Sequence, residues 1–319
     1  MKHRQLGRSD LSVAPLAFGG NVFGWTVDEK MSFRLLDHFV ERGFNLVDTA
    51  DAYSKWVPGH KGGESETILG QWIAQGGGRR DKIVLATKVG MPMSDTETGL
   101  SRERIMAAVN ASLKRLKTDH IDLYQAHQDD AKTPLEETLT AFDDLIKAGK
   151  VRVIGASNYS AERLSEALSV SAEKKIARYE TLQPLYNLLE RKGFEAALLP
   201  VCEQKDIGVI PYSSLASGFL TGKYRSEKDL GKSPRGKNLG KYLDKRGDAV
   251  LAALDEASKK LGCTQGCVAL AWLMKQSTIS APIASATSID QLDELLKATE
   301  IEIDDEMAKA LQQASEGSD

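Results

Sequence analysis

Strand-like and helix-like segments alternate along almost the whole of this 319-residue chain. Short aliphatic runs bounded by glycine or polar residues indicate strands, and segments with apolar residues at helical spacing lie between them. The predicted strands span residues 16–20, 44–48, 82–88, 121–127, 151–155, 179–183, 207–212 and 279–283. Such alternation predicts parallel strands, because each crossover helix returns the chain to the same edge of the sheet.

Eight strand–helix units have the size of a closed barrel, which takes about 250 residues. We therefore predict an α/β fold, a (β/α)₈ TIM barrel, with an open doubly wound sheet as the alternative. Residues 3–20 alternate apolar and polar around the turn at 7–10, which predicts an N-terminal β-hairpin cap. No linker-like stretch divides residues 1–319, so we expect a single domain. The segment 19–24 lacks the dinucleotide-binding glycine pattern of a Rossmann fold.

Charge and cysteine content narrow the classes of function. The net charge of -3 argues against a nucleic-acid partner. The polar N-terminus and the absence of a run of 18 apolar residues argue against export and a membrane partner. Three cysteines fit a reducing compartment, so we expect a cytoplasmic protein. Cys263 and Cys267 lie four residues apart without a nearby third ligand, and we expect core packing there and no metal.

Polar side chains end almost every predicted strand, where barrels of this type build their active sites. They are Asp48, Lys88, His127, Ser157, Asn158, Gln183, Tyr212 and Ser213. A buried acid requires a partner, so we expect Asp48 to pair with Lys88. Tyr53, in the loop after Asp48, is a candidate proton donor, because an adjacent ammonium stabilises its phenolate and lowers its pKa.

Several motifs around these residues occur in a fixed order. They are residues 48–53 (DTADAY), 63–70 (GESETILG), 121–124 (IDLY) before His127, 155–159 (GASNY), 183–188 (QPLYNL) and 212–224 (YSSLASGFLTGKY). In these motifs the chain resembles the aldo-keto reductase family over nearly its full length. The Asp, Tyr, Lys and His tetrad of that family falls on Asp48, Tyr53, Lys88 and His127.

The resemblance implies NAD(P)H-dependent hydride transfer between the cofactor and a small carbonyl/alcohol pair: an aldehyde, a ketone or a sugar. Tyr53 is then the general acid/base, Lys88 held by Asp48 lowers its pKa, and His127 orients the carbonyl. A regulatory cofactor-binding subunit with slow turnover is the alternative. A metal-dependent hydrolase or lyase using Asp48 and His127 is a third hypothesis, which the missing ligand cluster disfavours.

The resemblance also implies a set of cofactor contacts. They are Ser157, Asn158, Gln183, Tyr212, Ser213, Leu215, Ser217, Gly218, Lys223, Arg225, Ser285, Ala286, Thr287, Ser288, Gln291 and Glu294. The first three suit the nicotinamide carboxamide, and Tyr212 offers a face for its ring. Residues 285–288 lack the cation that pairs with the 2′-phosphate in the family, which weakens the argument for NADPH. The resemblance nevertheless implies NADPH, with NADH as the alternative.

The basic loop 223–246 and two tryptophans complete the expected site. We expect Lys223 and Arg225 to clamp the cofactor pyrophosphate, with a solvated loop as the alternative. Trp25 and Trp56 are expected to wall the substrate pocket, with buried packing as the alternative.

Overall fold

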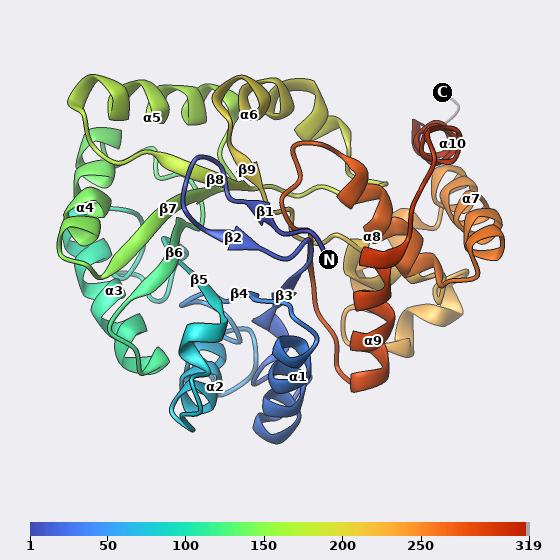
Figure 1. Ribbon diagram of the computed structural model, residues 1–319, viewed down its shortest axis with the longest axis horizontal. Helices are drawn as coiled ribbons and strands as arrows, with labels where there is room; N and C mark the ends of the chain where they lie inside the picture. Colours follow the sequence, from blue (N-terminus) through green and yellow to red (C-terminus); the bar gives the residue numbers. More distant parts are fainter. Residues whose placement is uncertain (317–319) are drawn as a thin grey trace.

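A computed structural model describes residues 1–316, in which eight parallel strands curl around a common centre with helices outside them (Figure 1). Their order is β10-β3-β4-β5-β6-β7-β8-β9. The bounds are β3 Ala17–Gly19, β4 Leu46–Asp48, β5 Val84–Val89, β6 Ile121–Ala126, β7 Val151–Ser157, β8 Tyr179–Gln183, β9 Gly208–Val209 and β10 Ile283–Ala284. The predicted α/β barrel class is confirmed.

The helices follow the predicted alternation. They are α1 Glu29–Glu41, α2 Glu64–Ile73, α3 Arg102–Leu116, α4 Leu135–Lys147, α5 Ala161–Lys174, α6 Leu199–Lys205, α7 Lys245–Leu261, α8 Gln265–Lys275, α9 Ile289–Lys297 and α10 Asp305–Glu316. Side-chain caps fix several starts, as where the Ser101 side chain accepts from the Arg104 amide ahead of α3. Gly43, at a φ of +84°, takes the left-handed conformation just beyond α1.

The last two barrel strands are shorter than expected and lie partly elsewhere. Residues 207–212 were predicted to form one strand, but β9 covers only Gly208–Val209, and the strand expected at 279–283 is replaced by β10 at Ile283–Ala284. Pro211 and Pro282 explain the interruption, because proline has no N–H to donate to a ladder. The barrel still closes, since the Ser280 amide donates to the Val209 carbonyl and the Ile283 amide to the Pro211 carbonyl.

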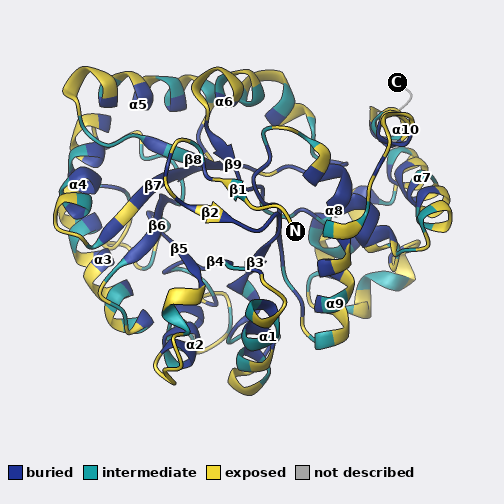
Figure 2. Ribbon diagram, in the orientation of Figure 1, coloured by how far each residue is buried: buried dark blue, intermediate teal, exposed yellow. Residues whose placement is uncertain are grey.

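The predicted hairpin is confirmed as β1 (Arg4–Gln5) paired antiparallel with β2 (Ser12–Val13), and it crosses the end of the barrel that faces the viewer in Figure 1. Its apolar residues join inward-facing strand residues in one buried cluster. The cluster includes Leu6, Leu11, Val13, Leu46, Val84, Leu123, Val153 and Ile210. Figure 2 shows the strands buried and the outer faces of the helices exposed. The hairpin therefore closes the end opposite to the strand C-termini.

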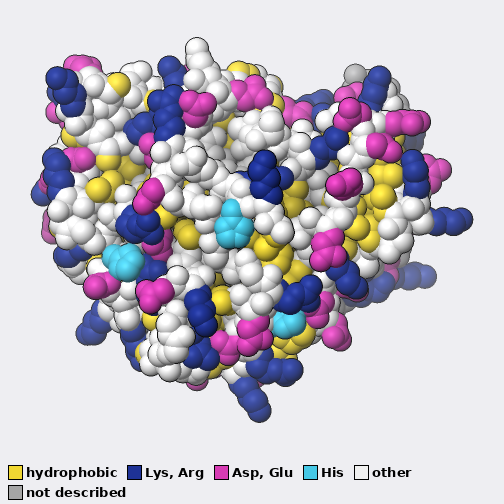
Figure 3. All heavy atoms as spheres, in the orientation of Figure 1, with side chains coloured by type: hydrophobic (Ala, Val, Ile, Leu, Met, Phe, Trp, Pro, Cys, Tyr) yellow, Lys and Arg dark blue, Asp and Glu magenta, His cyan; other side chains and the backbone are white. Residues whose placement is uncertain are grey.

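The surface carries both signs of charge. Figure 3 shows Lys and Arg side chains interspersed with Asp and Glu over the face in view, without a large patch of one sign. Among residues 1–316, no helix is both long enough and apolar enough to cross a membrane.

Candidate functional site

Asp48 and Lys88 form a buried ion pair at the C-terminal ends of neighbouring strands. Asp48 ends β4, Lys88 lies near the end of β5, and their side chains are 1% and 0% exposed. The Lys88 Nζ donates to Asp48 Oδ2 at 2.6 Å and to the Thr49 carbonyl at 2.9 Å. The parallel register of β4 and β5 brings the pair together, as the sequence predicted.

Tyr53 reaches the same ammonium from the loop after β4. The Lys88 Nζ donates to the Tyr53 hydroxyl at 2.8 Å and lies 4.6 Å from the ring centroid, and the hydroxyl donates to Asp48 Oδ2 at 3.3 Å. Burial, and after it the Asp48 carboxylate, raises the pKa of Tyr53 well above its ordinary value. We expected Lys88 to lower this pKa, but burial and the Asp48 carboxylate set its direction, and Arg235 is the cation that opposes them.

Two glutamines hold the far side of Asp48. Gln183, at the end of β8, donates to Asp48 Oδ1 at 2.9 Å, and Gln125 of β6 donates to the same oxygen at 3.3 Å. Sequence reasoning missed Gln125, and it assigned Gln183 to the cofactor, whereas the structure directs its amide N–H to Asp48. The polar position of Gln125 inside an apolar strand was the available signal, because a buried amide requires a partner.

His127 follows β6 and faces Tyr53 edge to face, with ring centroids 5.9 Å apart. Its Nδ1 is buried and has no hydrogen-bond partner among the described residues. Burial, and after it Lys88, lowers the pKa of His127 well below its usual value. The imidazole is therefore neutral at neutral pH. The structure thus brings together the four residues Asp48, Tyr53, Lys88 and His127.

The two predicted pocket tryptophans stand beside Tyr53. The Trp56 ring lies 6.1 Å from the Tyr53 ring and 5.5 Å from the Trp25 ring, both edge to face. Trp56 is 49% exposed, so it is not buried packing. Arg235, from the loop between β9 and α7, lies over the Trp25 ring at 5.3 Å. Sequence reasoning included Arg235 in a basic loop but missed this position, since no periodicity shows which of its cations turns inward.

A second group of predicted residues gathers at the ends of β7 and β9. The Asn158 side chain donates to the His127 carbonyl at 2.9 Å and accepts from the Tyr212 hydroxyl at 2.9 Å. Ser157, the last residue of β7, donates to the Gln183 carbonyl at 2.8 Å. Asn158 is exposed at a φ of +54°, and Tyr212 is partly buried.

The segment after Tyr212 takes a left-handed backbone conformation at several predicted contacts. The predicted contacts Ser213, Ser217 and Gly218 have φ values of 53°, 55° and 98°, and Ala216, which was not predicted, has a φ of 48°. Turns of this kind point backbone N–H groups into one concavity, which suits an anion. Leu215 precedes this short helical turn.

The two proposed clamp residues make only local contacts. Lys223 is exposed beside the ring of Tyr224, and Arg225 forms an ion pair at 2.9 Å with Asp255 of α7. The cation of Arg225 therefore already has a partner within the protein.

Residues 285–294 form a turn leading into α9. Ser285 donates to the Gly19 carbonyl and to Asn21, Ala286 is buried, and Ser288 caps α9. The Gln291 side chain accepts from the Thr287 amide and hydroxyl, both at 3.0 Å. The Glu294 carbonyl accepts from the Cys267 thiol at 2.7 Å.

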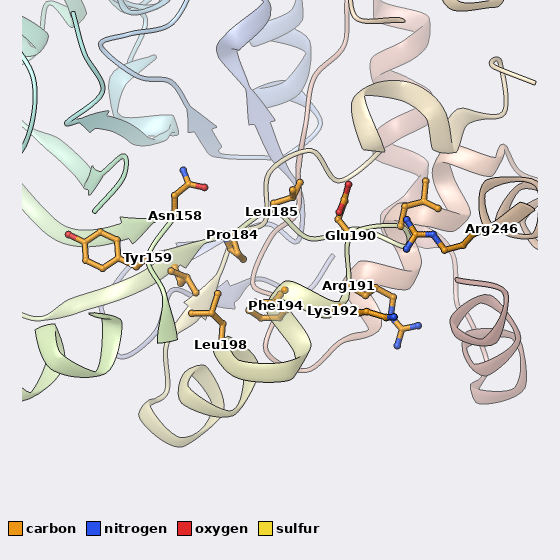
Figure 4. A pocket seen from close by; sticks show the side chains of 13 residues that line it. Asn158, Tyr159, Pro184, Leu185, Glu190, Arg191, Lys192, Phe194, Leu198 and Arg246 are labelled. Atoms are coloured by element: carbon orange, nitrogen blue, oxygen red, sulfur yellow. The ribbon is translucent and has the colours of Figure 1, made fainter. Parts of the chain in front are cut away.

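A cavity of about 380 Å³ lies next to Asn158 rather than beside the tryptophans. Its floor is apolar, with Leu182, Leu189, Phe194 and Leu198 among the lining residues. Figure 4 shows Asn158 and Tyr159 at one end and Arg191, Lys192 and Arg246 at the other.

Known proteins resemble this chain over nearly its full length. Residues 15–316 match the model of the Aldo/keto reductase family. The uncharacterized oxidoreductase YrpG of Bacillus subtilis is 38% identical, over 98% of this chain and 95% of that protein. A probable voltage-gated potassium channel subunit beta of Arabidopsis thaliana is 35% identical, over 94% and 92%, and the aldo-keto reductase YhdN of Bacillus subtilis is 33% identical, over 91% and 85%. The chain belongs to the aldo/keto reductase family.

Proposed function

We propose that this protein reduces carbonyl compounds with a hydride from NAD(P)H, and that Tyr53 donates the proton. One observation carries the proposal: the Lys88 ammonium contacts both Asp48 Oδ2 and the Tyr53 hydroxyl, at 2.6 Å and 2.8 Å. This geometry gives a phenol proton a protein-held cation that stabilises the phenolate left behind.

The roles of the other residues follow from their contacts. The raised pKa of Tyr53 keeps its proton in place at neutral pH, until charge develops on a carbonyl oxygen beside it. Asp48, fixed by Gln125 and Gln183, holds Lys88 in position. His127 is neutral and faces Tyr53, so its ring can donate a hydrogen bond to the same oxygen.

The residues at the ends of β7, β9 and β10 fit a nicotinamide dinucleotide. We assign Tyr212 and Asn158 to the nicotinamide, the left-handed turn at 213–218 to the pyrophosphate, and residues 285–294 to the adenosine end. The bound cofactor supplies the hydride. NADPH is the proposed cofactor, and NADH is the alternative.

The clamp hypothesis for Lys223 and Arg225 has a direct test. Calorimetric titration of NADPH into a Lys223→Ala/Arg225→Ala variant should show weaker binding if the two cations contact the cofactor. Asp255→Asn is the matched control, because it frees Arg225 from its ion pair without removing a cation. Unchanged affinity of the double variant would reject the clamp.

Turnover itself is tested by following NADPH and NADH absorbance with a panel of aldehydes, ketones and sugars. We expect cofactor oxidation with at least one substrate class, and a loss of that activity in Tyr53→Phe. A protein that binds the cofactor but oxidises it with none of these carbonyls would contradict the proposal.

A cofactor-binding regulatory subunit is the second candidate function. The observation that favours it is the similarity to proteins named as probable voltage-gated potassium channel subunits beta, from Arabidopsis thaliana and, at 33% identity, Oryza sativa. In that case the protein should bind the cofactor tightly and turn over slowly with every carbonyl. Single-turnover rates measured beside cofactor affinity separate the two functions.

A further inference from the structure

Arg235 brings a cation to the proton donor with no counter-ion to balance it. It lies in the segment between β9 and α7, and its guanidinium rests on the Trp25 ring. Its Nη2 is buried and has no hydrogen-bond partner among residues 1–316. Within the same residues, no carboxylate lies within ion-pair distance of its guanidinium.

Leaving the Arg235 guanidinium buried without an acceptor costs free energy. A buried N–H without an acceptor loses its hydration and gains nothing in return, and the cost is larger for a charged group. Two other partly buried arginines are ion-paired, Arg104 with Asp51 at 2.9 Å and Arg115 with Glu66 at 2.6 Å. Arg4, which is also partly buried, donates to the backbone carbonyls of Ile279 and Met274. The unpaired state of Arg235 is therefore not typical of cations in this fold.

The position of Arg235 relates it to the reacting end of the site. The cation acts on Tyr53, where its charge favours the phenolate and partly opposes the effects of burial and Asp48 on the pKa. The rings of Trp25, Trp56, Tyr53 and His127 follow one another at centroid distances of 5.5, 6.1 and 5.9 Å. This aromatic wall has a cation at one end and the tetrad at the other.

We infer that Arg235 binds the carboxylate of the substrate, so that the protein acts on flat carbonyl compounds that carry an anionic carboxylate. The inference rests on the proposed function, because it places the substrate carbonyl at Tyr53 and His127. A planar guanidinium matches a carboxylate in a two-point geometry, and aromatic faces suit a flat body between the two ends. A guanidinium can also bind a phosphate in this way, so the test includes an aryl phosphate.

The test compares three aldehydes that differ only in the group opposite the carbonyl: 4-formylbenzoate, methyl 4-formylbenzoate and 4-formylphenyl phosphate. In Arg235→Met, kcat/KM for 4-formylbenzoate should fall by about ten- to a hundredfold, the range for a lost hydrogen bond to a charged group. The methyl ester reports whatever the missing charge does to Tyr53 itself, so its kcat/KM should fall by clearly less than that of the acid. Comparing each aldehyde with itself across variants cancels the intrinsic reactivity of its carbonyl.

Two further variants separate the position of the charge from its presence. Arg235→Lys should recover part of the activity on 4-formylbenzoate, because it keeps the charge and loses the planar fork. Lys237→Met is the matched control, since Lys237 is an exposed cation in the same segment. Lys237→Met should leave kcat/KM unchanged for both 4-formylbenzoate and its methyl ester.

Three results would overturn the inference. One is an equal loss on the acid and the ester in Arg235→Met; another is a larger loss on the phosphate than on the carboxylate. The third is weaker NADPH binding by the variant in calorimetry, which would assign the cation to the cofactor.

A binding measurement keeps this test separate from that of the proposed function. The product 4-(hydroxymethyl)benzoate is titrated calorimetrically into the cofactor-free protein, with its methyl ester alongside. Binding of the acid that Arg235→Met weakens supports the inference even if no aldehyde is reduced, whereas equal binding of acid and ester contradicts it. If none of the three aldehydes oxidises NADPH, that result counts against the proposed function and leaves the binding test of Arg235 intact.

Discussion

The two halves of the barrel rim are built differently. In the half formed by β4, β5 and β6, the functional side chains contact one another: Lys88 joins Asp48 and Tyr53, and Asp48 accepts from Gln125. In the half formed by β7, β9 and β10, side chains mostly bond to backbone or within one turn. Asn158 donates to the His127 carbonyl, and Gln291 in the first turn of α9 accepts from the amide of Thr287, just before that helix.

The difference indicates that the first half is preorganised for proton transfer, whereas the second half is suited to binding a cofactor. A charged network assembled by the protein needs no ligand to hold its geometry, so it is ready for proton transfer. Turns and hydroxyl groups offer many weak donors that a large cofactor can use. Single substitutions should therefore have large effects in the first half and modest effects in the second.

Removing the Tyr53 hydroxyl should have the largest effect. In Tyr53→Phe, carbonyl reduction at saturating cofactor should fall by about two to four decades, the usual contribution of a positioned general acid. The ring remains, so the fold and cofactor affinity should be unchanged by circular dichroism and calorimetry. Tyr179→Phe is the control, since its buried hydroxyl hydrogen-bonds, within residues 1–316, only to the Tyr159 hydroxyl at 3.1 Å. A Tyr53→Phe rate above about a tenth of wild type would mean that another group donates the proton.

Breaking the Asp48–Lys88 pair should cost stability as well as activity. Lys88→Met leaves the Asp48 carboxylate buried without its cation, which should lower the free energy of unfolding in urea by about 3–5 kcal/mol. Lys147→Met is the matched control: it breaks an ion pair of the same 2.6 Å length with Asp143, but Lys147 is 68% exposed. Its cost should be small, because an exposed ion pair contributes little to stability. An equal loss of unfolding free energy in the two variants would show that burial does not make the Asp48–Lys88 pair more important for stability.

Cofactor discrimination should be modest, because the turn at residues 285–288 offers hydroxyl groups and no cation. We expect NADPH to bind about ten- to a hundredfold more tightly than NADH, as for one charge-assisted hydrogen bond. Calorimetric titration of both cofactors measures the ratio. A preference above about a thousandfold would assign the 2′-phosphate to another cation, first among those of residues 223–246.

Asp51, an acid in the loop after β4, should make the stability of the protein depend on pH. Burial, and after it Glu66, raises the pKa of Asp51 from 3.8 to about 7 despite its contact with Arg104. Between about pH 4 and 7 the folded protein holds a proton that the unfolded chain has lost, so this contribution to stability declines as pH rises. Asp51→Asn should remove that decline, a slope of at most about 1.4 kcal/mol per pH unit.

Urea unfolding at pH 5, 6, 7 and 8 measures this slope. The exposed Asp95 provides the control variant Asp95→Asn, which should follow the wild type at every pH. A wild-type slope retained in Asp51→Asn would assign the titration to another group.

The alternation of strand and helix segments was sufficient to predict the barrel, its hairpin and the meeting of Asp48, Lys88 and His127 at one rim. Periodicity and capping residues such as Ser101 are local, and strand C-termini of a parallel barrel converge whatever fills the loops. The ends of β9 and β10 were predicted less well, because Pro211 and Pro282 interrupt the ladder at points where the apolar pattern continues.

Only the tertiary structure decided what each polar group contacts and how it titrates. The Gln183 side chain lies 2.9 Å from Asp48, although 135 residues separate them, and Arg235 reaches the ring of Trp25 from a loop that has no periodicity. The pKa of Tyr53 depends on burial and on the Asp48 carboxylate, which act through space and dielectric rather than along the chain. Residue types and their order determined the family and the tetrad, whereas packing determined the partners and protonation of its members.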